Sequence, residues 1–108
     1  MIYEVRVYEA ADGKAAAMRE RFVNTVASRF FPRHGIELLG AFVASTEDGR
    51  LTYMTRFETE DARKKAWEAF AADPEWAKVK ADTEKDGPLL KSQSMSILSP
   101  VISGLVLG

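Results

Sequence analysis

The sequence predicts an α+β fold in which four antiparallel strands form one sheet and two helices cover one of its faces. Strand-like and helix-like apolar patterns follow one another in the order β-α-β-β-α-β, and turn signals separate them. The chain has 108 residues, which suits one domain. A chain of this length buries about two thirds of its unfolded surface in a single core.

The first strand is expected over residues 2–8, because side chains of different character alternate there. One face carries Tyr3, Val5 and Val7, and the other carries Glu4, Arg6 and Tyr8. An apolar stripe at three- and four-residue steps then predicts a helix over residues 14–30. We expect this helix to end before Pro32, since proline disfavours helical backbone in the residue that precedes it.

The second and third strands are expected to pair as an antiparallel hairpin. Residues 36–44 are apolar at nearly every position, which predicts a strand covered on both faces. Residues 47–50, Glu-Asp-Gly-Arg, are a hairpin turn signal. Residues 51–57 alternate again and are predicted to return as the third strand.

The second helical segment is predicted in two pieces. Thr59 is a helix start, and Asp73 can cap a restart that has Pro74 at its first position and extends toward Lys85. The inner stripe of the first piece is expected to be Ala62, Ala66, Ala69 and Phe70, with Trp67 alongside. The basic run at residues 63–65 is predicted to lie on the solvated face.

A fourth strand over residues 90–98 completes the ferredoxin-like order, which leaves one sheet face without helices. The side chains expected there form a larger apolar patch than a soluble monomer usually exposes: Tyr8, Leu39, Ala41, Val43 and Met54. We therefore predict an obligate homodimer. Residues 1–100 are expected to form the domain and residues 101–108 an apolar arm that lies on protein, with fraying as the alternative.

Composition argues against several classes of partner. Fifteen Lys and Arg residues against sixteen Asp and Glu residues give a net charge of −1, which disfavours nucleic acid and anionic membranes. The chain has no cysteine and one histidine, so we expect no metal, haem or flavin. No targeting or membrane-spanning pattern is evident, and the cytoplasm is the expected compartment.

Two groups of candidate site residues emerge. Glu4, Arg6 and Arg56 are expected on the uncovered sheet face, either as a polar network between subunits or as an anion site. His34, the lone histidine, is interpreted as a loop or capping residue, with a role as ligand or base as the alternative.

A candidate cleft is expected between the helices and the sheet, where a small apolar or aromatic ligand could bind. Its residues are Tyr53, Trp67, Phe70 and Trp76, and the alternative is that they only pack in the core.

Several segments resemble the NIPSNAP family along nearly the whole chain. They are the opening strand at residues 2–8, the entry to the second strand at 34–40, the Ala-Asp-Pro-Glu-Trp run at 72–76, and residues 92–94 and 97–100. The chain departs from the family at Ser94 and Ser99, where an acidic residue and an arginine are frequent. The resemblance implies a dimeric α/β barrel in which two sheets stack through their uncovered faces.

Two functions from different classes follow. The first is a homodimeric small-molecule-binding or interaction module of NIPSNAP type. The alternative is a cofactor-independent monooxygenase or related enzyme of the same barrel class, acting on a small apolar substrate. No catalytic residue is assigned from the sequence.

Overall fold

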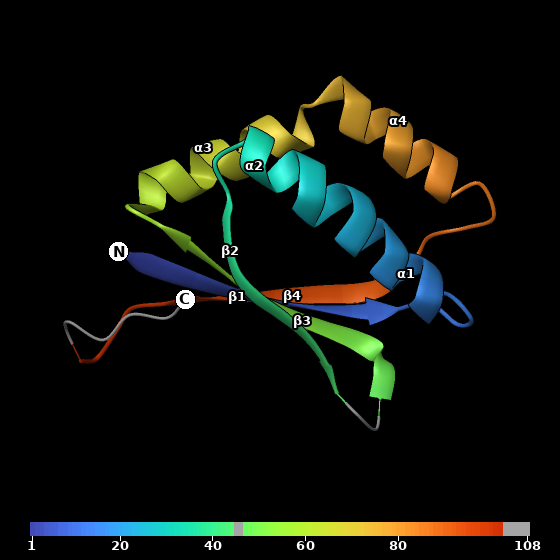
Figure 1. Cartoon of the computed structure of the whole chain (residues 1–108), viewed down its shortest axis with the longest axis horizontal. Helices are drawn as coiled ribbons and strands as arrows, with labels where there is room; N and C mark the ends of the chain where they lie inside the picture. The colour runs from blue at the N-terminus through green and yellow to red at the C-terminus, as the bar shows by residue number, and fades with distance from the viewer. Residues whose placement is uncertain (45–46, 103–108) are drawn as a thin grey trace.

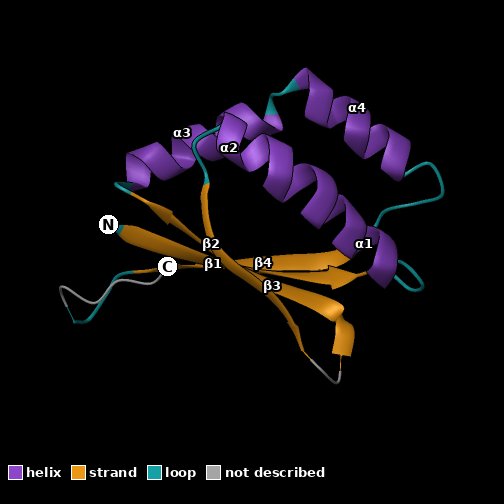
Figure 2. Cartoon of the chain, in the orientation of Figure 1, coloured by secondary structure: helices purple, strands orange, loops and turns teal. Residues whose placement is uncertain are grey.

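The structure is a computed structural model that describes residues 1–44 and 47–102. Its sheet has four antiparallel strands in the order β2-β3-β1-β4: β1 (Ile2–Ala10), β2 (Glu37–Ala44), β3 (Glu47–Phe57) and β4 (Leu90–Leu98). All helices lie on one face of this sheet (Figure 1 and Figure 2). The predicted ferredoxin-like α+β fold is confirmed.

The first helical segment runs unbroken from residue 15 to residue 33, as α1 (Ala15–Arg21), η1 (Phe22–Phe30) and α2 (Phe31–Arg33). The prediction that it ends before Pro32 is wrong. The turns of η1 are wide, and at their end the Phe31 N–H donates to the carbonyl of Val26, five residues back. Pro32 comes directly after these turns, in the first turn of α2, where a missing N–H is tolerated. The segment ends at Gly35, whose φ of 70° is typical of a helix C-terminus.

The predicted turn at residues 47–50 lies inside β3 instead. Ala44 already pairs with Glu47, and Arg50 lies opposite Glu9 of β1 with their side chains 2.7 Å apart. Pairing of Glu47 with β2 and of Arg50 with β1 therefore holds both ends of this segment in the sheet. Residues 45–46 lie outside the described residues.

The alternation of β1 is confirmed, but its faces are the reverse of those expected. Glu4 lies opposite Thr55, and both are fully buried under the helices. Directly paired residues share a sheet face, so Glu4, Arg6 and Tyr8 point toward the helices. The prediction that these three side chains lie on the uncovered face is wrong. Ala41 and Val43 are also on the helix side, because they pair with Tyr53 and Leu51.

The uncovered face nonetheless carries several large apolar side chains, which are those of Tyr3, Phe42, Met54 and Leu98. Val5 pairs with Met54, and Tyr3 pairs with Leu98. The Phe42 side chain lies over Gly40 and is 66% exposed. Residues 98–102 border a hollow of about 340 Å³ over Tyr3 and Met54. Residues 103–108 of the predicted arm lie outside the described residues.

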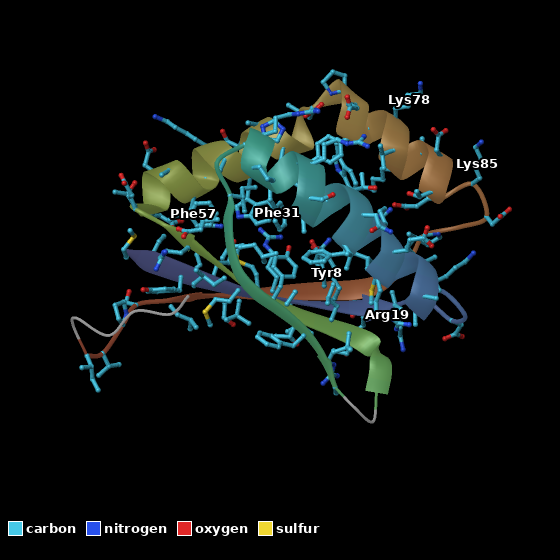
Figure 3. All side chains as sticks on the ribbon, in the orientation of Figure 1. Tyr8, Arg19, Phe31, Phe57, Lys78 and Lys85 are labelled. Carbon is cyan, nitrogen blue, oxygen red and sulfur yellow. The ribbon has the colours of Figure 1, made fainter. Side chains whose placement is uncertain are left out.

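The core lies between the helices and the helix side of the sheet. In Figure 3 the Phe31 and Tyr8 side chains lie in this layer, whereas Lys78 and Lys85 point outward. Phe31 is 1% exposed and meets the rings of Phe22, Tyr53, Trp67 and Phe70 at centroid distances of 5.6–6.1 Å. The core is thus mainly aromatic.

Candidate functional site

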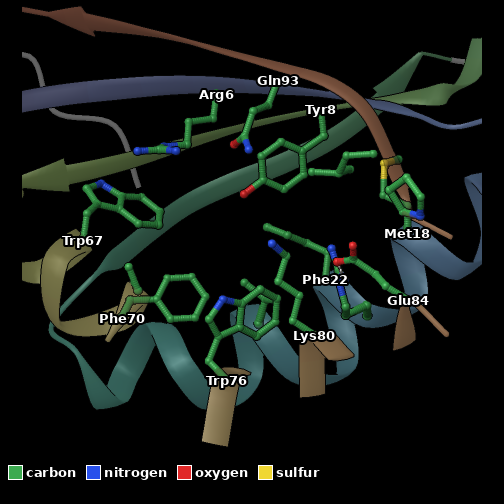
Figure 4. A pocket seen from close by; sticks show the side chains of 15 residues that line it. Arg6, Tyr8, Met18, Phe22, Trp67, Phe70, Trp76, Lys80, Glu84 and Gln93 are labelled. Atoms are coloured by element: carbon green, nitrogen blue, oxygen red, sulfur yellow. Dashed lines mark hydrogen bonds and ion pairs between the residues drawn. The ribbon is translucent and has the colours of Figure 1, made fainter. Parts of the chain in front are cut away.

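A cleft of about 480 Å³ opens between the helices and the β1–β4 side of the sheet (Figure 4). We call it the aromatic cleft. It is lined by side chains of α1, η1, α3, α4, β1 and β4 and of the loop before β4: Arg6, Tyr8, Met18, Arg21, Phe22, Val26, Trp67, Phe70, Ala71, Trp76, Lys80, Glu84, Pro88, Leu90 and Gln93.

The cleft exists because the helical chain restarts after α3 (Glu60–Ala71) and leaves the sheet. Asp73 caps α4 (Pro74–Thr83) by accepting a hydrogen bond of 2.9 Å from the Glu75 N–H, and Pro74 occupies the first turn. The predicted restart is confirmed. In Figure 1, α4 lies beyond α1 and away from the sheet, and no residue of α4 is fully buried.

Three of the four predicted aromatic residues come together in the cleft. The Phe70 ring lies 5.0 Å from the Trp76 ring and 5.9 Å from the Trp67 ring, centroid to centroid. Tyr53 is 0% exposed and lies deeper, so the structure does not place it on the cleft wall. Tyr8, which was expected on the other face of the sheet, lines the wall in its place.

Tyr8 and Tyr53 join the cleft to the core. Their hydroxyl oxygens are 2.7 Å apart, so one phenol donates to the other. Burial raises the pKa of both Tyr8 and Tyr53. Both phenols are therefore neutral at physiological pH, and Tyr8 presents an uncharged hydroxyl to the cleft.

Glu4 organises the charges below the aromatic cleft. Its carboxylate accepts hydrogen bonds from Trp67 Nε1 at 2.7 Å, Arg63 Nη1 at 3.0 Å and Arg6 Nη2 at 3.3 Å. The Arg6 guanidinium also lies 3.9 Å from the centroid of the Trp67 ring, in a cation–π contact. Arg63, expected on the solvated face, is 7% exposed, because Glu4 requires a partner on the helix side.

The charges on the cleft wall are mostly positive. The described lining residues include three cations, Arg6, Arg21 and Lys80, and one carboxylate, Glu84, which is paired with Arg21 at 2.8 Å. Sequence reasoning missed Lys80. Its place four residues after Trp76, on the same face of a helix, is the signal that could have found it. Chemically, this wall can hold an anion beside an aromatic surface.

The other predicted polar residues lie elsewhere. Arg56 is on the uncovered face and donates to Glu37 across 3.0 Å. Arg56 lies on the opposite sheet face from Glu4 and Arg6, so a single chain does not bring the three residues of the predicted network together. His34 follows α2, and its Nε2 lies 2.8 Å from Oδ2 of Asp73. His34 is the C-cap residue of α2, and its side chain connects the two helical segments, a contact that the sequence did not predict.

Asp73 gives the fold a defined acid dependence. Its hydrogen bond with His34, together with that from Arg33, lowers the pKa of Asp73 from 3.8 to about 2. A lowered carboxyl pKa stabilises the fold above the unfolded-state value and ceases to do so as pH falls through the folded-state value. We expect the melting temperature of the wild type to fall from about pH 4 to pH 2 more steeply than that of Asp73→Asn, which lacks the titrating group. Parallel profiles by circular dichroism would contradict this.

Two further features bear on the kind of site. The described residues contain no group of three or more His, Cys, Asp or Glu side chains that could hold a metal ion. Among the same residues, no helix has the length and apolar character needed to cross a membrane.

Comparison with known proteins places these features in context. The model of the NIPSNAP family matches residues 3–103. A NIPSNAP family protein from Agrobacterium tumefaciens superposes with a TM-score of 0.78 at 23% identity, over 93% of this chain and 92% of the other. A NIPSNAP domain protein from Burkholderia xenovorans gives 0.79 at 18% identity, over 98% and 100%.

A more distant likeness is to an oxygenase. The cofactor-independent oxygenase SnoaB from Streptomyces nogalater superposes with a TM-score of 0.65 at 16% identity, over 95% of each chain. At these identities the solved structures show a shared fold. No curated protein matches the chain in sequence.

Proposed function

The chain belongs to the NIPSNAP family, and we propose that it acts as a homodimer that binds a small apolar or aromatic molecule in the aromatic cleft. The observation that carries the proposal is the meeting of Trp67, Phe70 and Trp76 on one wall of a cleft of about 480 Å³. Ligand sites are commonly concave, of about 300–1,000 Å³, and lined by aromatic side chains with a few polar groups.

Tryptophan emission tests the proposal directly. The chain has two tryptophans, and both line the cleft. We expect a saturable change in emission when a panel of aromatic and fatty compounds is titrated, because a bound ligand changes the surroundings of at least one indole. N-acetyl-tryptophanamide under the same titration controls for absorption by the ligand. No change in emission with any compound of the panel would instead favour a pure interaction module.

The homodimer is proposed from the uncovered sheet face. Phe42 is 66% exposed and Leu98 is 42% exposed there, and a second sheet would cover both. We expect Met54→Asp, in the middle of this face, to produce monomers, because a stable interface of about 1,500 Å² does not tolerate an unpaired buried charge. Light scattering at micromolar concentration measures the mass. Lys78→Asp, on the outer side of α4, is the control and should stay dimeric, whereas a monomeric wild type would refute the dimer.

The remaining expectations stay part of this proposal. Residues 1–100 would form the dimerising domain, and residues 101–108 would pack on protein as an arm. Val101 is 99% exposed and Ile102 is 62% exposed within one chain, which supports a role in covering apolar surface. The cytoplasm as compartment also stays a prediction, which cell fractionation tests.

A second candidate is a cofactor-independent monooxygenase acting on a small apolar substrate. Its support is the fold shared with the Streptomyces oxygenase. Oxygen uptake with each compound that binds in the titration would establish it. Binding without uptake favours the non-catalytic function.

A further inference from the structure

We propose that the ligand of the aromatic cleft is an organic acid, whose apolar body lies on Trp67, Phe70 and Trp76 and whose carboxylate is held by Arg6, Tyr8 and Lys80. This inference rests on the proposed function and specifies the class of ligand. It follows from hydrogen-bond donors of Arg6, Tyr8 and Lys80 on the cleft wall that have no described partner.

Glu4 does not engage all the hydrogen-bond donors of Arg6. Glu4 is engaged more closely by Trp67, at 2.7 Å, and Arg63, at 3.0 Å, than by Arg6, at 3.3 Å. The Nε of Arg6 is buried and has no hydrogen-bond partner. A guanidinium carries five N–H donors, and a buried donor without a partner is costly. Arg6 lines the cleft against Trp67, and Glu4 engages only its Nη2, so the guanidinium can also donate to an anionic acceptor that enters the cleft.

The hydroxyl of Tyr8 is also a donor toward the cleft. Tyr53 is 0% exposed, and its only described side-chain partner is the Tyr8 hydroxyl. The Tyr53 proton is satisfied only when Tyr53 donates to Tyr8, because the alternative leaves that proton buried without an acceptor. Tyr8 then accepts from Tyr53 and keeps its own proton for the cleft.

Lys80 supplies the opposite wall. Figure 4 shows its side chain and the Tyr8 hydroxyl pointing into the cleft from different sides. Lys80 forms no ion pair among the described residues, whereas Glu84, the carboxylate on the wall, is held by Arg21 at 2.8 Å. An entering carboxylate therefore meets two cations and a hydroxyl donor, and an amine would meet repulsion.

Matched acid and amide probes test the inference. We would compare 4-phenylbutyrate with 4-phenylbutyramide, and octanoate with octanamide, by isothermal titration calorimetry on the intact protein at low salt. Each pair shares its apolar body and differs in the charge of its head. We expect each acid to bind about tenfold or more tighter than its amide, as charge-assisted hydrogen bonds to a carboxylate predict.

Variants of the cleft residues test whether the preference for acids over amides arises in the cleft. Lys80→Met removes an exposed side chain without an ion pair, so the fold should persist, and the acid-to-amide ratio should fall several-fold. Tyr8→Phe should lower the ratio as well. Lys78→Met, two residues away on α4 and outside the cleft lining, is the matched control and should leave the ratio unchanged.

The outcomes separate this inference from the proposed function. If amides bind as tightly as acids, or if Lys80→Met and Tyr8→Phe both keep the wild-type ratio, the acid specificity is refuted while small-molecule binding stands. If neither acids nor amides bind and the tryptophans are silent across the wider panel, the proposed function itself fails.

Discussion

Glu4→Gln is expected to destabilise the fold by about 3 kcal/mol, because it removes the charge from the buried centre of an ionic network. Glu4 is 0% exposed, and Arg63, which it binds at 3.0 Å, is 7% exposed. Glutamine has nearly the same size and can still accept from Trp67. The variant therefore isolates the lost charge, and Arg63 keeps only its pairing with Glu60 at 2.7 Å.

Urea denaturation measures this loss, and Glu75→Gln is the matched control. Glu75 also pairs with arginines, Arg29 and Arg33, but it lies in the helix layer and its side chain is 45% exposed, so its loss should amount to about 1 kcal/mol or less. Equal losses in the two variants would show that Glu4 is solvated. Combining Glu4→Gln with Arg63→Met should restore part of the stability, because the uncompensated charge is then absent.

The elements of this fold could be predicted because their signals are local. The strand at residues 90–98 has the predicted bounds, and Thr59 caps α3 by accepting from the Ala62 N–H. The Asp73 cap is likewise a matter of neighbouring residues. Such signals need no knowledge of what packs on the element.

The choice of faces could not be predicted, because it depends on partners distant in sequence. Alternation in β1 shows that the strand has two faces. The face that carries Glu4 and Arg6 is polar by composition, and only their contacts with Arg63 and Trp67 show that helices cover it. In α3 the same cause applies. Ala62 and Ala69, expected on the inner stripe, are exposed, and Arg63 is inside because it reaches Glu4.

The candidate site was predictable in its aromatic part only. Trp67 and Phe70 are three residues apart on one helix, so their meeting follows from helical spacing. The polar part joins Arg6 and Tyr8 of β1 to Lys80 of α4 across the cleft. That meeting depends on how far α4 departs from the sheet, which no local pattern in the sequence encodes.

Phe31→Ala is expected to cost about 4 kcal/mol of unfolding free energy, since truncating a buried phenylalanine leaves a cavity that rigid neighbours fill poorly. Phe31 is 1% exposed, and four aromatic rings surround it. Two of them, Trp67 and Phe70, also line the aromatic cleft. The substitution should therefore weaken ligand binding as well as stability.

Phe42→Ala is the matched control, because it removes the same ring from the uncovered sheet face. Phe42 is 66% exposed within one chain, so its loss should leave the stability of a single subunit nearly unchanged and should weaken the proposed dimer instead. Light scattering at several protein concentrations measures association, and urea denaturation in the monomeric Met54→Asp background measures the stability of a single subunit. We expect Phe31→Ala to lower the stability of the single subunit and Phe42→Ala to weaken association. The reverse assignment would mean that Phe31 lies at the interface and that the helix layer does not form the core.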